Sequence, residues 1–262
     1  MAGAKLVFFD VDGVLLTSAF TVPESAGRAI RAARANGHLC VINSGRPYSH
    51  VDPRIREIGF DGYVCSCGMN VMLHGESLLH ESFSPAFSHA CVRVNREQHV
   101  EVIYESEEGM WFDFTQPMNS YLQRSHDHFG QFVAVDGDID SPEFFFDKFS
   151  AWCTEDTDLE AYLAFLEPHF DIILRAPMIY ELVAKGYTKA TGMDLIRSAT
   201  GIPFEDTYAL GDSRNDLLML QNVAHPIVMG NGMEEVKELA EFVTDDLEFD
   251  GVEKALQHYG LI

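Results

Sequence analysis

Short, mostly apolar runs separated by a helical segment are the clearest pattern in the first third of the chain. Residues 6–9, 38–42 and 61–65 have the composition of strands, and the first two end abruptly at polar residues. Pro23 and Glu24 open an expected helix that runs to about residue 35, with Pro23 in its first turn and Gly37 after its end. Apolar runs of this kind indicate strands buried on both faces, so the β-α-β order predicts a parallel sheet covered by helices.

The pattern changes at about residue 84, where expected strands follow one another without a helix between them. The expected helices are 84–98, 118–129, 142–146 and 156–167, and the expected strands are 100–104, 110–114, 132–135, 148–152, 171–174 and 179–183. Adjacent strands indicate an antiparallel or mixed sheet. From residue 186 the first pattern resumes. We therefore expect an α/β protein whose Rossmann-like parallel-sheet core domain, residues 1–83 and 186–262, carries an inserted α+β domain, residues 84–185.

Candidate chemistry lies where the apolar runs stop. Asp10 and Asp12 follow the first run, Ser44 follows the second, and residues 211–216 (Gly-Asp-Ser-Arg-Asn-Asp) follow a later expected strand. In an open parallel sheet, ligands collect at this carboxyl edge. Alternation along an extended chain puts residues 10 and 12 on the same side, and two carboxylates so close together favour a shared cation. Gly13 lets the backbone turn sharply beside a ligand.

Each of these motifs has a simpler interpretation when it is taken alone. Asp-x-Asp-Gly is a common turn, Ser44 fits an ordinary helix cap, and Lys189 in the first turn of an expected helix fits a solvated surface residue. Together they favour a metal site, because converging carboxylates without compensation would be strongly destabilising. Mg²⁺ prefers such oxygen ligands, and a nearby Lys189 suits a phosphate bound to the ion.

The overall charge narrows the range of partners. Lys and Arg number 18 against 41 Asp and Glu, which gives a net charge of −23, so we expect neither nucleic acid nor an anionic membrane as a partner. The five cysteines lack zinc-type spacing and are expected to be reduced. The apolar runs are too short for a signal peptide or a membrane span, which favours the cytoplasm. The sequence does not define the oligomeric state and allows a monomer.

Four motifs carry a family resemblance. They are residues 10–14 (Asp-Val-Asp-Gly-Val), residues 43–46 (Asn-Ser-Gly-Arg), Lys189 after residues 181–182 (Glu-Leu) and a glycine, and residues 211–216. In this order and spacing they resemble the motifs of the haloacid dehalogenase superfamily of phosphotransferases. The inserted domain resembles the large α+β cap of its Cof-type sugar-phosphatase subgroup. The resemblance covers nearly the whole chain.

The resemblance implies a role for each motif residue. Asp10 would be the nucleophile that forms an aspartyl-phosphate, and Asp12 would be the general acid and base. The implied sets are Asp10 and Asp12 for catalysis, Ser44, Gly45, Lys189 and Asn215 for phosphate, and Asp10, Asp12, Asp212 and Asp216 for Mg²⁺. Within the last set, Asp12 would contribute its backbone carbonyl, and Asp216 would act as a ligand or through water.

The expected function is that of a Mg²⁺-dependent phosphatase acting on a small phosphorylated metabolite. A phosphomutase or phosphotransferase that uses the same aspartyl-phosphate is the alternative. A receiver-type signalling module fits less well, because it would lack the inserted domain. A non-catalytic phosphate-binding protein would not need Asp12 beside Asp10. One departure concerns the third strand, which commonly runs into Asn-Gly-Ala in Cof-type relatives and here meets Cys67, Gly68 and Met69.

Overall fold

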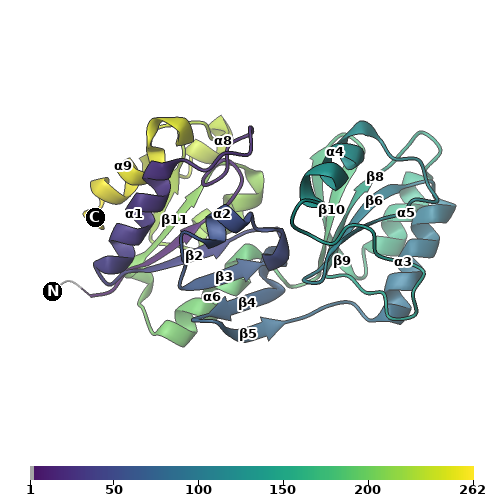
Figure 1. Ribbon diagram of the computed structural model, residues 1–262, viewed down its shortest axis with the longest axis horizontal. Coiled ribbons are helices and arrows are strands. Elements are labelled where there is room, and N and C mark those ends of the chain that lie inside the picture. Colours follow the sequence, from purple (N-terminus) through teal and green to yellow (C-terminus); the bar gives the residue numbers. More distant parts are fainter. Residues whose placement is uncertain (1–2) are drawn as a thin grey trace. The chain divides into compact units, whose positions relative to one another are not determined.

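The computed structural model describes residues 3–262, which divide into two compact units. The core unit comprises the described residues up to Gly45 together with Val51–Leu79 and Thr188–Ile262, and the inserted unit comprises Arg46–His50 and His80–Tyr187. Each unit is built on its own sheet (Figure 1). Among residues 3–262, no helix combines the length and the apolar character needed to cross a bilayer.

The core unit contains an eight-stranded sheet in the order β13-β12-β11-β1-β2-β3-β4-β5. Its strands are β1 (Leu6–Phe9), β2 (Leu39–Asn43), β3 (Gly62–Cys65), β4 (Asn70–Leu73), β5 (Glu76–His80), β11 (Thr207–Gly211), β12 (His225–Val228) and β13 (Phe242–Val243). All neighbouring pairs from β13 to β3 are parallel, which confirms the predicted parallel core, while β4 runs antiparallel to β3.

Strand β1 lies at the centre of this sheet. All four of its residues are buried, and it pairs in parallel with β11 on one side and with β2 on the other. The register aligns Phe9 with both Ile42 and Leu210, so the three strands end at the same edge. Residues that directly follow β1, β2 and β11 therefore meet there.

Helices cover both faces of the core sheet. They are α1 (Glu24–Ala35), α2 (Pro53–Arg56), α6 (Lys189–Thr200), α7 (Leu217–Gln221), α8 (Glu234–Lys237) and α9 (Gly251–His258). Met193 and Ile196 of α6 pack in one apolar cluster with Leu6 and Phe8 of β1. The opposite face packs on α1, with α9 beside it (Figure 1). Burial on both faces explains why β1 tolerates no polar residue before Asp10.

The inserted unit holds a five-stranded sheet in the order β7-β6-β8-β10-β9, and every neighbouring pair is antiparallel. Its elements are β6 (Glu101–Glu105), β7 (Met110–Phe112), β8 (Lys148–Trp152), β9 (Phe170–Ala176), β10 (Ile179–Ala184), α3 (Pro85–Glu97), α4 (Ser120–Phe129) and α5 (Leu159–Leu166). Its main core is aromatic and includes Tyr104, Phe146, Phe149 and Phe170. The predicted antiparallel or mixed sheet of an inserted α+β unit is thus confirmed.

Two predicted elements of the inserted unit are wrong. Residues 132–135 form no strand, although Met110 donates a backbone hydrogen bond to Ala134 at 2.9 Å. Residues 142–146 form no helix, and Phe146 is fully buried from an irregular segment. In both places the apolar residues fill a core from a loop, and a short apolar run does not distinguish that case from a regular element.

Candidate active site

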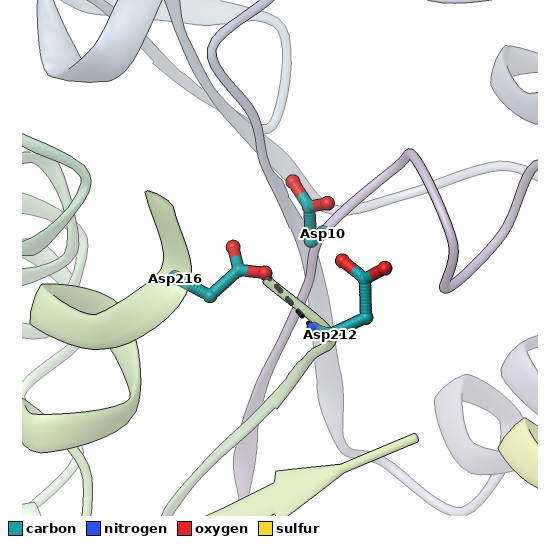
Figure 2. A group of neighbouring side chains, drawn as sticks. All are labelled: Asp10, Asp212 and Asp216. Carbon is teal, nitrogen blue, oxygen red and sulfur yellow. Dashed lines mark hydrogen bonds between the residues drawn. The ribbon is translucent and has the colours of Figure 1, made fainter. Parts of the chain in front are cut away.

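Three aspartates meet at the carboxyl edge of the core sheet. Asp10 follows β1, Asp212 follows β11, and Asp216 lies one turn further along the chain. One carboxylate oxygen from each lies within 4.8 Å of the other two. Figure 2 shows the carboxylates of Asp10 and Asp212 side by side, with that of Asp216 turned toward them. The structure therefore brings together residues separated by about 200 positions, as the sheet register requires.

Lys189 lies among these carboxylates. Its Nζ is 2.6 Å from Asp10 Oδ1 and 2.6 Å from Asp216 Oδ1, and its side chain is 3% exposed. It is the first residue of α6, which begins at the N-cap Thr188 with a capping box completed by Thr191. The cap fixes where α6 starts, and this start places the ammonium group between two of the three carboxylates.

Asp216 is held through both of its oxygens. While Oδ1 accepts from Lys189, Oδ2 accepts from the backbone N–H groups of Asp212 at 2.9 Å and Ser213 at 3.1 Å. A Cβ on Gly211 would lie 2.7 Å from the Cβ of Asp216, so only glycine fits there. Asp216 thus shapes the loop that carries Asp212.

Asp212 has an unsatisfied oxygen. Its Oδ1 is buried and has no hydrogen-bond partner among residues 3–262. A Cβ on Gly13, whose φ is +78°, would lie 2.1 Å from Asp212 Oδ2, so the turn after Asp12 must be glycine for this carboxylate to keep its place. A buried acceptor without a donor is costly, and a cation would satisfy it.

The electrostatics of the cluster confirm a surplus of negative charge. Burial and the neighbouring Asp216 raise the pKa of Asp10 well above its ordinary value, although Lys189 opposes the shift. Burial, followed by Asp216, raises the pKa of Asp212 to about 6. Burial alone would lower the pKa of Lys189, but Asp10 and Asp216 raise it, so the lysine stays charged. One ammonium does not balance three carboxylates, and hard carboxylate oxygens are the donors that Mg²⁺ prefers.

Asp12 lies on the same edge, in a tight turn closed by hydrogen bonds from the N–H groups of Leu15 and Leu16 to the carbonyl of Val11 at 2.9 and 2.8 Å. Its side chain is exposed, in contrast to that of Asp10. Its charge contributes to the raised pKa values of both Asp10 and Asp212. An exposed carboxylate beside a buried one can exchange protons with solvent.

The remaining predicted residues, Ser44, Gly45 and Asn215, also belong to the core unit. Ser44 is buried, its N–H donates to the carbonyl of Val64 at 2.8 Å, and its own carbonyl accepts from Cys67 at 3.2 Å. Gly45 follows directly, half-buried. The Oδ1 of Asn215 accepts a hydrogen bond from the Ser213 hydroxyl. The Ser44 backbone is thus held between β3 and the turn that follows it.

Two supporting residues were not predicted. Asn231 donates to the carbonyl of Gly13 at 2.9 Å and accepts from the N–H of Leu247 at 2.8 Å, which ties the first loop to a distant one. Asn43 donates to the backbone carbonyl of Lys189 at 3.4 Å. The sequence contained a signal for each, because Asn231 lies between two glycines after a strand and Asn43 directly precedes Ser44.

Comparisons with known proteins show what this chain is similar to. A model of the haloacid dehalogenase-like hydrolase family matches residues 7–256. The chain is 27% identical to "Putative phosphatase YkrA" of Bacillus subtilis (strain 168), with 99% of each chain covered. It is 25% identical to the 5-amino-6-(5-phospho-D-ribitylamino)uracil phosphatase YcsE of the same organism, covering 98% of this chain and 96% of YcsE. The solved structure of the HAD subclass IIB sugar phosphatase BT4131 matches with a TM-score of 0.81 and 27% identity. The match covers 99% of this chain and 100% of the BT4131 chain.

Proposed function

The chain belongs to the haloacid dehalogenase-like hydrolases and is a phosphatase, and we propose that it hydrolyses small phosphorylated metabolites with Mg²⁺ through an aspartyl-phosphate on Asp10. The family match confirms the resemblance carried by the four motifs. The observation that carries the proposal is the unbalanced cluster of Asp10, Asp212 and Asp216, in which Asp212 Oδ1 has no hydrogen-bond partner within residues 3–262.

The donor set fits Mg²⁺. The carboxylates of Asp10 and Asp212 and the backbone carbonyl of Asp12 would hold the ion. Asp216 would act through water, because both of its oxygens already accept hydrogen bonds. When bound, the ion would balance the surplus charge and draw electron density from the phosphoryl oxygens.

Each residue of the site would have a separate role in the reaction. Asp10 would attack phosphorus, forming a carboxylate oxygen–phosphorus bond while the bond to the leaving oxygen breaks and Asp12 donates a proton to that oxygen. Asp12 would then take a proton from water, which attacks the same phosphorus and releases phosphate with Asp10 restored. Lys189, Ser44 and the N–H of Gly45 would hold the phosphoryl oxygens, with Asn215 nearby.

We assign residues 84–185 as the cap and residues 1–83 and 186–262 as the catalytic domain. YcsE is a phosphatase of a phosphorylated ribitylaminouracil, which supports a small organic phosphate as the substrate class here. We place the enzyme in the cytoplasm, since all five cysteines are free and four of them are buried.

The Asp12→Asn variant tests the covalent step directly. p-Nitrophenyl phosphate has a leaving group that needs little protonation, so Asp10 would still be phosphorylated, whereas water activation without the Asp12 carboxylate would be slow. We expect the phosphorylated chain to accumulate with Mg²⁺ and to be visible by intact-protein mass spectrometry, at the expense of steady-state turnover.

Two controls define the outcome. Wild type should release phosphate over many turnovers with Mg²⁺ and stop when the ion is chelated. If Asp12→Asn never carries phosphate while wild type still turns over, the aspartyl-phosphate mechanism is wrong. An isomerised sugar phosphate formed without free phosphate would instead identify a phosphomutase or phosphotransferase.

A further inference from the structure

The core unit contains a surface cavity of about 480 Å³, open to solvent, that none of the proposed catalytic residues lines. Helices α1 and α2, labelled in Figure 1, contribute to its wall together with the connection that precedes α1. Arg28 and Arg31 of α1 and Arg54 of α2 line it, and Val22 and Ile58 provide apolar surface. The volume is typical of a small-molecule site.

The side chains that line this cavity are mainly positively charged, although the chain as a whole is negatively charged. The chain carries a net charge of −23 with 18 Lys and Arg, yet three arginines share this one cavity. Glu24 is the only acidic residue among the described residues that line it, and its side chain is 95% exposed. A positive cavity in a strongly negative protein would concentrate small anions locally.

The three guanidinium groups differ in the number of hydrogen bonds and ion pairs that they already make within the protein. Arg54 pairs with both oxygens of Asp52 and donates to the carbonyl of Phe20 at 2.8 Å. Arg28 meets Glu24 only at 3.8 Å and Glu253 at 4.0 Å. Arg31 has no hydrogen bond or ion pair to any residue between 3 and 262. Two guanidinium groups on one helix face are therefore open to a ligand.

Gly27 is an independent sign that this cavity is kept open. It lies inside α1, where glycine is less favourable than alanine. Packing does not require it, because an added Cβ would lie 3.4 Å from Arg31 Nη1 and 3.5 Å from Ile58 Cγ1, which is ordinary contact. The missing methyl group instead leaves room beside the Arg31 guanidinium and the apolar wall.

We propose that this cavity is a second, non-catalytic binding site for a small organic anion with a phosphoryl-type head group. The tetrahedral dianion would accept paired hydrogen bonds from Arg28 and Arg31, because the planar guanidinium matches phosphate oxygens two at a time. The organic part would lie on Val22 and Ile58. The proposal is independent of the catalytic function, since the site shares no residue with the aspartate cluster.

Phenylphosphonate is the probe, because its carbon–phosphorus bond is not a substrate for phosphoester hydrolysis. In the full-length protein with EDTA, we expect saturable chemical-shift changes in the Nε–H signals of Arg28, Arg31 and Arg54 at constant ionic strength. Methylphosphonate should bind at least threefold more weakly, because it lacks the apolar part. A linear, non-saturating drift in these signals, as bulk salt would give, would overturn the proposal.

Charge-matched variants locate the binding. Arg28→Gln/Arg31→Gln should weaken phenylphosphonate binding at least tenfold, with p-nitrophenyl phosphate turnover unchanged. Arg93→Gln/Arg124→Gln, which removes two exposed arginines of the inserted unit, should leave binding unchanged. An equal loss in both double variants would show general charge attraction and contradict a built site.

The Gly27→Ala variant separates binding from folding, because the two effects have opposite signs. The added methyl group should raise the melting temperature through helix propensity and should weaken phenylphosphonate binding at least threefold by filling the cavity wall. If affinity is unchanged while the melting temperature rises, Gly27 has no part in a binding site and the proposed cavity is the wrong place.

Discussion

Both units bury charged residues, but they balance them differently. In the core unit, Lys189 faces Asp10 and Asp216, while Asp212 adds a third carboxylate.

In the inserted unit, Lys148 bonds Glu181 and lies 3.6 Å from Glu105. There, Arg175 also lies 3.5 Å from Glu181, so two carboxylates face two cations. The inserted unit thus matches its carboxylates with cations, and the core unit does not.

The pKa values of two buried carboxyl groups show the consequence. Burial pushes the pKa of both Glu105 and Asp10 upward. For Glu105, Lys148 and His50 outweigh burial and the pKa is lowered, whereas for Asp10 the pKa stays raised because Asp216 adds to burial. Burial alone therefore does not mark a functional site. A buried carboxylate whose pKa remains raised indicates a missing cation, and a balanced one indicates a structural network.

The largest effect should come from Asp10→Asn. An amide cannot attack phosphorus, so turnover of p-nitrophenyl phosphate should fall by roughly 10⁴-fold or more. Because the change removes surplus charge, the free energy of unfolding in EDTA should not decrease. Asp194→Asn, on the half-exposed side of α6, is the control and should keep full activity. Wild-type turnover in Asp10→Asn would eliminate the covalent mechanism.

The next largest effect should be on stability in the inserted unit. Lys148→Met would leave Glu105 and Glu181 buried without their shared cation, and breaking a buried pair in this way costs about 3–5 kcal/mol. Urea unfolding measures the loss. Lys185→Met provides the matched control, because Lys185 is exposed, and it should change stability by less than about 1 kcal/mol. Similar values for the two variants would show that the charge balance of this network is not structural.

A smaller effect should appear in the pH dependence of stability, which differs between the buried carboxylates of the two units. The folded-state pKa of Asp212 is raised from 3.8 to about 6, so its contribution to stability is present at low pH and is lost as pH rises through about 6. In EDTA, the free energy of unfolding should therefore fall by on the order of 1–3 kcal/mol between pH 4 and 7. Glu105 has a lowered pKa, so its opposite contribution changes only below its ordinary value of 4.5.

Mg²⁺ should remove this loss of stability, because the ion binds the deprotonated carboxylates and stabilises the folded state. Asp212→Asn should weaken the pH dependence in EDTA, to which Asp10 also contributes through its raised pKa, and should abolish the response to Mg²⁺. Denaturation curves at pH 5, 6 and 7, with and without the ion, measure both effects. A pH dependence that Mg²⁺ leaves unchanged would place the titrating groups outside the proposed metal site.

The sequence was sufficient to predict which polar residues follow the central strands because the sheet is simple. Asp10, Ser44 and Asp212 each follow a strand that is buried on both faces, and such strands are recognised by composition alone. The sequence could not give the bonds of Lys189 to Asp10, which is 179 positions away, or the two backbone donors to Asp216. Those contacts depend on how α6 and the loop after β11 pack against the sheet.

The errors in the inserted unit have a related cause. Its core is filled partly from loops, so residues such as Val133 and Phe144 are buried without belonging to a strand or a helix. Its charge network was also not predicted, since Glu105, Lys148 and Glu181 come together only through the antiparallel pairing of β6, β8 and β10. A local sequence pattern therefore predicts whether a residue is buried more reliably than it predicts the element that carries the residue or the side chains that contact it.

The smallest expected effect concerns the backbone beside Ser44. Ser66, Cys67 and Gly68 have φ values of +48°, +54° and +94°, and Gly68 must be glycine because a Cβ would lie 2.2 Å from the carbonyl of Thr188. Asparagine tolerates this left-handed conformation better than cysteine does. Cys67→Asn should therefore raise the free energy of unfolding by about 0.5–1 kcal/mol, measured by urea denaturation. Cys67→Ala removes the thiol without this preference and should not stabilise the protein. Equal stabilities of these two variants would show that the thiol, and not the backbone conformation, determines the fit at this position.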